Sequence, residues 1–277
     1  MKKLMLLSVA LCLLFVGCEK EGIYNPSKKI RRIYEQPQSS MKQLSQEWTW
    51  DKNLLTKVDY YYGNQLSYTE NYKYDDKKRI IKVEDYKYGD YYTVTYNDNV
   101  YSKVEYFWDN KLVESYSFSY ENKKVSRIVC IFFNDYKSGK SNGFISQIIP
   151  MNIIEKIKGN MQKAGASTST VTLNIKYDGN NVSEIETMED GFVERTSFEN
   201  YDSKTNPFYS SFPLAGASVF SKNNPGKTIS RLVYEDESYM LATDLDYTYD
   251  GNFPIEIVEK YTIGTINFRN TTFIEYK

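Results

Sequence analysis

From Trp48 onward, apolar and aromatic residues alternate with polar residues along most of the chain. Val58, Tyr60 and Tyr62 occupy every second position and are followed by Gly63-Asn64. Period-two alternation interrupted by Asn, Asp and Gly is typical of antiparallel strands joined by hairpin turns. The pattern therefore predicts an all-β fold in which consecutive strands form a meander.

An aromatic residue ends many of the alternating runs, just before a polar turn. We call these residues the repeat aromatics; they are Trp50, Tyr74, Tyr96, Tyr120, Tyr177, Tyr201 and Tyr249. The first four are separated by 24, 22 and 24 residues, and Tyr249 follows Tyr177 by 72, which is three such periods. A period of this length predicts a repeating unit of two strands and two turns.

A meander with this many strands must curl, close or split in two to bury one face. We therefore expect a single β domain over 46–277, an antiparallel meander of about 24-residue two-strand repeats curled into an open barrel or a strongly bent sheet. A transmembrane barrel is the alternative architecture. The strands lack the lipid-facing row of Leu, Val and Phe that this alternative requires.

Two insertions interrupt the repeat. In 143–169, isoleucine and methionine recur at helical spacing, which predicts one short helix at about 151–163. Its apolar stripe is expected to cover the open face of the sheet, and binding to a partner is the alternative. The second insertion, 202–227, contains Asn206-Pro207-Phe208 and is expected to form a long loop or a cap on the sheet.

The first residues have the features of a secretory leader. Residues 1–3 are Met-Lys-Lys, residues 4–16 are apolar, and Phe15-Val16-Gly17-Cys18 follows. This apolar run is too short to cross a bilayer as a helix, so we interpret 1–17 as a signal peptide. Its end is similar to the lipobox of bacterial lipoproteins. Residues 18–45 contain Pro26 and Pro37, show little periodicity, and are expected to form a tether.

Several motifs together resemble a known group of proteins. The Tyr-x-Tyr-Asp turns, Asn206-Pro207-Phe208, Ser221-Lys222-Asn223-Asn224-Pro225 and the lipobox occur in an order that resembles Bacteroidetes lipoproteins of unknown function, and the turns look distantly like the YD repeats of large secreted bacterial proteins. The resemblance implies a curved or barrel-like sheet, lipidation of Cys18 and attachment to the membrane through that residue. It also implies an outer-membrane lipoprotein that faces the periplasm or the cell surface. It supplies no catalytic residues.

The amino-acid composition excludes several kinds of catalytic and metal-binding site. Histidine is absent, which excludes histidine-based catalytic triads and imidazole metal ligands. Of the three cysteines, Cys12 and Cys18 lie at the leader, so only Cys130 remains for the body of the fold, as a buried thiol. With 35 basic and 36 acidic residues, bulk charge does not indicate a nucleic-acid partner. We expect no catalytic residues, no metal and no cofactor.

The 27 tyrosines supply the candidate binding residues. A row of aromatic side chains on one face can stack on sugars or peptides, and the alternative is that these side chains fill the core of the sheet. The candidates are Tyr60, Tyr62, Tyr72, Tyr92 and Trp108, together with Asn206 and Phe208 in the second insertion. We expect a membrane-anchored, non-catalytic envelope lipoprotein that binds a glycan, peptide or protein partner. The alternatives are a polysaccharide hydrolase that uses paired carboxylates and a lipid-carrying half-barrel.

Overall fold

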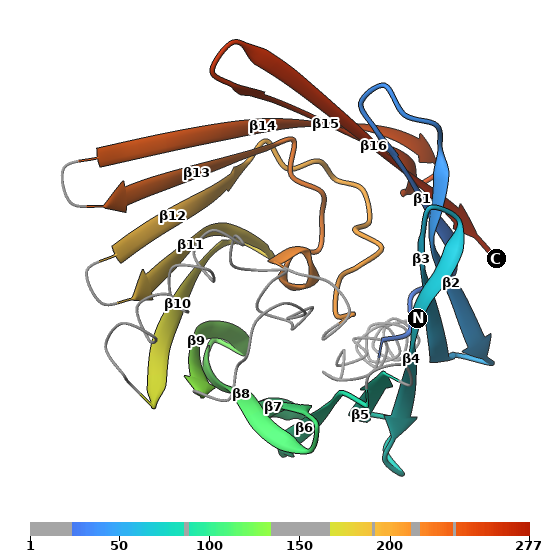
Figure 1. The fold of residues 1–277 in the computed structure, drawn as a ribbon, viewed down its shortest axis with the longest axis vertical. Helices are drawn as coiled ribbons and strands as arrows, with labels where there is room; N and C mark the ends of the chain where they lie inside the picture. Colours follow the sequence, from blue (N-terminus) through green and yellow to red (C-terminus); the bar gives the residue numbers. More distant parts are fainter. Residues whose placement is uncertain (1–23, 86–88, 134–166, 190–191, 212–216, 235–236) are drawn as a thin grey trace, which may run out of the picture.

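The computed structural model describes residues 24–85, 89–133, 167–189, 192–211, 217–234 and 237–277. In these ranges sixteen antiparallel strands pair in chain order, and the first strand pairs with the last (Figure 1). The strands are β1 (Ile30–Pro37), β2 (Gln43–Asp51), β3 (Leu54–Tyr62), β4 (Gln65–Tyr74), β5 (Ile80–Asp85), β6 (Tyr91–Asn97), β7 (Val100–Trp108), β8 (Lys111–Glu121), β9 (Lys124–Phe133), β10 (Thr168–Asp178), β11 (Asn181–Glu189), β12 (Phe192–Glu199), β13 (Lys227–Tyr234), β14 (Glu237–Asp250), β15 (Phe253–Ile263) and β16 (Ile266–Tyr276). The all-β meander is confirmed.

The sheet is a closed barrel, so the expectation of an open barrel or bent sheet is wrong. Closure depends on β1, which pairs with β2 on one side and with β16 on the other. The predicted tether over 18–45 is likewise wrong for 30–45, because this stretch contains β1 and the start of β2. A register shift between Ile30 and Arg32 breaks the period-two alternation, and this is why β1 looks aperiodic in the sequence.

The predicted helix at about 151–163 lies outside the described residues, as does most of the 143–169 insertion. The only helix in the described ranges is the short 3-10 helix η2 (Ala217–Phe220). None of the described helical residues forms a segment long and apolar enough to cross a membrane.

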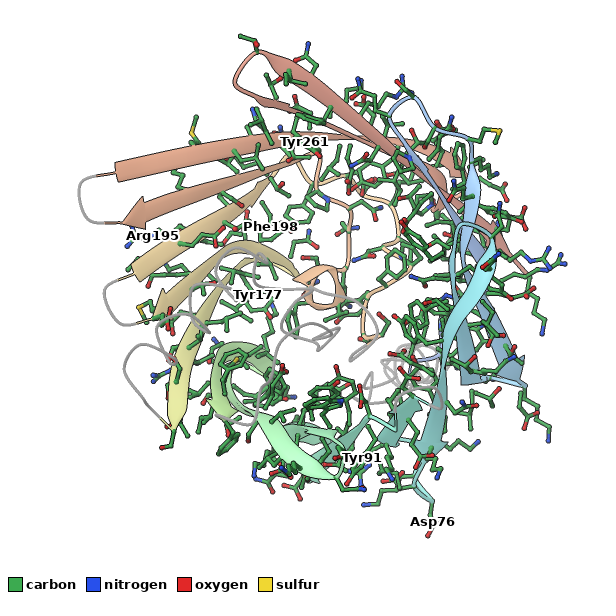
Figure 2. All side chains as sticks on the ribbon, viewed as in Figure 1. Asp76, Tyr91, Tyr177, Arg195, Phe198 and Tyr261 are labelled. Atoms are coloured by element: carbon green, nitrogen blue, oxygen red, sulfur yellow. The ribbon has the colours of Figure 1, made fainter. Side chains whose placement is uncertain are left out.

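Aliphatic and aromatic side chains face the inside of the barrel. Leu55, Val58, Val104, Ile128 and Val171 are fully buried there and belong to one continuous core cluster. Barrels of sixteen strands are wide enough to leave a central space. Here, the described residues of the connection from β12 to β13 (200–211 and 217–226, together called segment 200–226 below) run inside the ring of strands and occupy part of that space (Figure 1). Phe198 at the end of β12 points inward toward it (Figure 2).

The outer wall carries ion pairs. Arg32 faces Glu47 across β1 and β2, with 2.7 Å between the charged atoms. Comparable outer pairs around the barrel are Lys57–Asp59, Lys73–Glu84, Lys103–Glu105, Lys176–Glu184, Arg195–Glu186 and Lys260–Asp246. A transmembrane barrel presents an apolar band on this face, and charges there are costly. The described outer wall thus carries paired charges on many of its strands.

Most of the repeat aromatics lie next to a shift in the register of strand pairing. The register of strand pairing shifts immediately before six of them: Trp50, Tyr74, Tyr96, Tyr120, Tyr177 and Tyr249. In each case, the aromatic residue forms the last or the second-to-last residue pair before a hairpin turn. A bulge leaves backbone groups of the ladder without their usual partners. The next repeat supplies a partner. The Tyr120 hydroxyl, for example, donates to the carbonyl oxygen of Tyr101 at 2.9 Å, and Tyr101 pairs with the preceding repeat aromatic.

The same bond recurs around one end of the barrel. Other donor–acceptor pairs of this kind made by the repeat aromatics are Trp50 to Ile30, Tyr74 to Leu55, Tyr96 to Ile80 and Tyr201 to Val182, and Tyr276 on β16 makes the same bond to Pro254. Tyr201 is not at a hairpin bulge, but its hydroxyl spans the same 19-residue separation as those of Tyr74 and Tyr120. A neutral hydrogen bond of this kind contributes on the order of 1 kcal/mol. For these five repeat aromatics, the period in the sequence therefore reflects bonds to a backbone carbonyl of the preceding strands.

Candidate ligand-binding cavity

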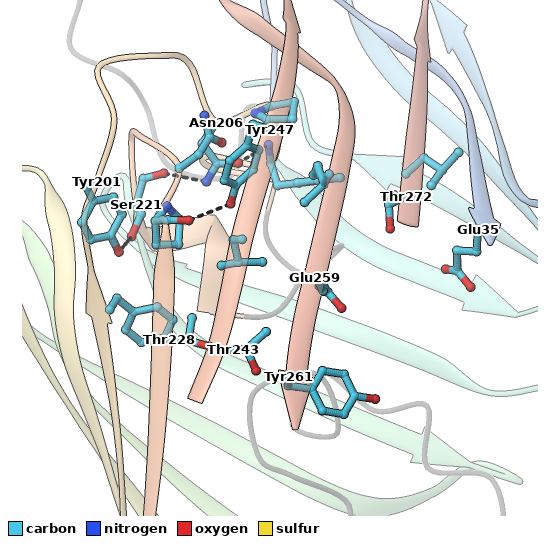
Figure 3. Close-up of a pocket in the computed structure, with 18 of the residues that line it drawn as sticks. Glu35, Tyr201, Asn206, Ser221, Thr228, Thr243, Tyr247, Glu259, Tyr261 and Thr272 are labelled. Atoms are coloured by element: carbon cyan, nitrogen blue, oxygen red, sulfur yellow. Dashed lines mark hydrogen bonds between the residues drawn. The ribbon is translucent and has the colours of Figure 1, made fainter. Parts of the chain in front are cut away.

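A cavity of about 680 Å³ lies inside the barrel, beside the seam where β1 meets β16 (Figure 3). One side is formed by inward-facing side chains of β12 to β16 and β1 to β3, and the other by segment 200–226. Alternation places every second residue of a strand on the inner face, which is why Leu241, Thr243, Leu245 and Tyr247 of β14 all reach the cavity.

Segment 200–226 is held in place by a dense set of hydrogen bonds. The Asn206 side chain is buried; its Nδ2 donates to the Ser221 carbonyl oxygen at 2.8 Å and its Oδ1 accepts from the Phe208 backbone amide at 2.9 Å. The Ser221 hydroxyl in turn accepts from the backbone amide of Val182 on β11. The Tyr247 hydroxyl donates to the Pro225 carbonyl oxygen at 2.9 Å. These bonds fix the segment to the wall, so the cavity is largely pre-formed.

Seven aromatic side chains contribute to the lining. They are Trp48, Tyr60, Phe198, Tyr201, Phe208, Tyr247 and Tyr261. The ionisable acids among the lining residues are Glu35 on β1 and Glu259 on β15, and β16, which carries Thr272, runs between them (Figure 3). Burial, and then the neighbouring charge of Glu35, raise the pKa of Glu259. The described lining includes neither Lys nor Arg, so its fixed charge is negative.

Three predicted site residues line this cavity: Tyr60, Asn206 and Phe208. Tyr72 lies nearby, because the hydroxyls of Tyr60 and Tyr72 both donate to Glu70, at 2.9 and 2.6 Å. Burial raises the pKa of the Glu70 carboxyl, and the two tyrosine hydrogen bonds oppose that rise. Tyr60 also stacks on Tyr68, with 4.3 Å between the ring centroids.

The other three aromatic candidates lie elsewhere. Tyr92 packs against the core and stacks on Tyr106 at 4.7 Å, outside the cavity lining. Tyr62 and Trp108 are 86% and 40% exposed, at the ends of β3 and β7 next to hairpin turns. The aromatic candidates therefore do not form one row on one face. Bulges such as the register shift between Tyr60 and Tyr61 change which residues face inward.

The pattern of the sequence does not predict the two cavity carboxylates. Glu35 lies in the stretch that was assigned to the tether. Glu259 follows Ile257 at the same parity in β15, and a carboxylate at a core-facing position of an alternating strand is the signal that would have identified it. Tyr247 and Tyr261 are also at inward positions, in strands that the repeat predicts.

Further carboxylates are buried inside the barrel. Glu114 and Glu194 are 1% and 4% exposed, and the Tyr116 hydroxyl donates to Glu114. Burial raises the pKa of Glu194 to about 7. The Oε2 atom of Glu194 has no hydrogen-bond partner among the described residues. Within the same ranges, no three His, Cys, Asp or Glu side chains come together in a way that would hold a metal ion.

The fold and the cavity together define a closed antiparallel barrel of sixteen strands with an aromatic, acidic interior. Two solved structures have a similar fold. A porin-like protein from Bacteroides vulgatus superposes with a TM-score of 0.55 and 10% identity, covering 91% of this chain and 99% of that one. A porin-like protein from Bacteroides uniformis gives 0.52 and 12%, covering 93% and 100%. No family model and no curated protein matches the sequence.

Proposed function

We propose that this chain is a non-catalytic envelope lipoprotein whose barrel binds a small ligand in its interior cavity. The cavity carries this proposal. Its volume of about 680 Å³ falls within the usual range for small-molecule sites, and aromatic walls with a few placed polar groups are typical of such sites. A glycan or a short peptide has the flat or apolar faces that tyrosine and tryptophan rings stack on. A lipid-carrying half-barrel fits less well, because the barrel is closed and the lining carries two carboxylates.

Attachment to the membrane is proposed to occur through Cys18 and not through the strands. The charged outer wall supports this, because it would be costly to place in lipid. With several acyl chains on Cys18, the protein would be anchored stably, in the outer membrane and facing the periplasm or the cell surface.

Mass spectrometry of membrane-extracted protein tests the anchor. We expect the N-terminal peptide to begin at Cys18 and to carry the added mass of acyl chains. Cys18→Ser should lack this mass and should leave the membrane fraction, because one residue supplies the whole attachment. Full-length Cys18 recovered without modification from the membrane fraction would contradict the proposal.

A fluorescent probe tests the cavity. N-phenyl-1-naphthylamine is apolar, aromatic and uncharged, and we expect its fluorescence to rise saturably with wild-type protein. Thr243→Trp fills the cavity from β14 and should weaken this binding at least tenfold, since the added ring occupies the space of the probe. Thr248→Trp makes the same change at an exposed position of the same strand and should leave binding unchanged.

Circular dichroism and thermal unfolding establish that both variants fold. If Thr243→Trp does not fold, Thr272→Phe on β16 fills the same cavity and replaces it. Absence of saturable binding by the wild type, or equal binding by the inward and outward tryptophan variants, would refute an interior site.

A further inference from the structure

Charge is segregated between the two faces of the barrel wall. On the outer face, Lys and Arg side chains form the ion pairs described above, for example Lys176–Glu184 and Arg195–Glu186, each at 2.7 Å. On the inner face, the described ionisable groups of the strands that we have placed there are acids: Glu35, Glu70, Glu114, Glu194 and Glu259. Unlike the outer carboxylates, Glu35, Glu70, Glu194 and Glu259 form no ion pair with a described Lys or Arg.

The two cavity acids are available to a ligand. Glu35 accepts a hydrogen bond from the Ser45 hydroxyl at 3.0 Å, which leaves most of its acceptor capacity unused. Glu259 forms no hydrogen bond or ion pair with any described residue, although it is only partly exposed. A half-buried carboxylate such as Glu259, without a described partner, is costly to ionise unless a cation neutralises it, whereas Glu35 is exposed and adds a second negative charge to the lining.

Glu194 is a second interior carboxyl group whose hydrogen bonding is incomplete. It is 4% exposed, and its Oε2 atom lacks a hydrogen-bond partner among the described residues. It is on β12, the strand that also contributes Phe198 to the cavity. The barrel interior therefore contains, besides the cavity acids, a buried carboxyl group whose hydrogen bonding is incomplete among the described residues.

Aromatic rings in the same cavity suit the rest of such a ligand. Trp48 on β2 and Tyr261 on β15 line the same cavity as Glu35 and Glu259. A cation held over the face of Trp or Tyr is attracted by the ring, more strongly where water is excluded. An amine or guanidinium also donates short, charge-assisted hydrogen bonds to carboxylates. An anion would meet only repulsion here, since the described lining offers it no basic side chain.

We propose that the cavity binds a small organic cation, with its amine or guanidinium group at Glu35 and Glu259 and its apolar body against the aromatic lining. This inference rests on the interior site proposed above and specifies the class of its ligand. A bound cation favours the ionised form of Glu259, so it opposes the burial and the Glu35 charge that raise its pKa. Binding is therefore expected to weaken as the pH falls and Glu259 takes up a proton.

Displacement of N-phenyl-1-naphthylamine by three matched competitors tests the charge preference. These are 1,8-octanediamine, 1,8-octanediol and octanedioate, which share a carbon chain and differ in end-group charge. We expect the diamine to displace the probe at concentrations at least tenfold lower than the other two compounds. Equal or stronger displacement by the diol or by octanedioate would overturn the proposal.

Glu259→Gln tests the assigned carboxylate. It should weaken diamine binding about tenfold, through loss of one charge-assisted bond, and change the affinity for the uncharged probe by a much smaller factor. The matched control is Glu256→Gln on the outer face of β15, which should alter neither. If Glu259→Gln does not fold, Glu35→Gln gives the same test from β1. Unchanged diamine affinity in the inward variants would refute the assignment.

Different results would refute the interior site and its preference for cations. If the wild type does not bind the uncharged probe, the interior site itself is refuted. If the probe binds but the diamine has no advantage over the diol, the interior site stands and only the preference for cations is refuted.

Discussion

Ile30→Ala is expected to lower the free energy of unfolding by about 2–5 kcal/mol, the range for truncating a fully buried aliphatic side chain. Ile30 is completely buried, pairs with Tyr276 of β16, and its carbonyl oxygen accepts the Trp50 indole hydrogen bond at 2.7 Å. The residue therefore lies at the seam that closes the barrel. Urea unfolding, monitored by tryptophan fluorescence and by circular dichroism, measures the change.

Arg31→Ala is the matched control. Arg31 is the next residue on β1, is exposed, and has no counterpart in the β1 and β16 register, which shifts between Ile30 and Arg32. Its removal should change the free energy of unfolding by no more than about 0.5 kcal/mol. Equal, small effects of the two changes would show that β1 does not contribute to closing the barrel.

Glu194→Gln is expected to remove a pH dependence of stability. Burial raises the pKa of Glu194 to about 7 from an ordinary 4.5. Between these values the folded protein binds more protons than the unfolded chain, so the free energy of unfolding falls as the pH rises and the loss is complete above pH 7. Between pH 5 and pH 8, the free energy of unfolding of the wild type should fall by about 2–3 kcal/mol more than that of the variant.

Glu186→Gln is the control, on the neighbouring strand β11. A hydrogen bond from Arg195 lowers the pKa of the Glu186 carboxyl, so the stability that it contributes is lost only as the pH falls below the ordinary range. Its removal should not alter the change in stability between pH 5 and pH 8. Urea unfolding of the three proteins at both values measures this, and parallel behaviour of the wild type and Glu194→Gln would contradict the assignment.

Local sequence predicted the elements of this fold well. Alternation around Val58 and Tyr60 and the Gly63-Asn64 turn correspond to β3, β4 and a two-residue hairpin in which both turn residues have positive φ. Even Tyr201, which follows from extending the period, makes the same kind of hydrogen bond as Tyr74, Tyr96 and Tyr120. These features depend on neighbours in the chain, and their signal is therefore present in any short window.

The site was predicted only in part, for a physical reason. Asn206 and Phe208 were identified because their segment interrupts a regular repeat. Glu35 and Glu259 were not, because they are far apart in the chain and meet only where β1 and β15 flank β16. Whether a carboxylate faces water or the interior depends on strand parity, and each bulge along a strand resets that parity.

By itself, the sequence determined the strand type, the turns and the period of the repeat, since alternation and turn residues act locally. Only the tertiary structure decided that β1 pairs with β16, because a ring closes through contacts between the two ends of the strand order, and no local pattern encodes them. Closure then defined an inside. Because the sheet closes, the interior acids lie on one side of the wall and the paired charges lie on the other. Aromatic residues that are far apart in the chain line one cavity for the same reason.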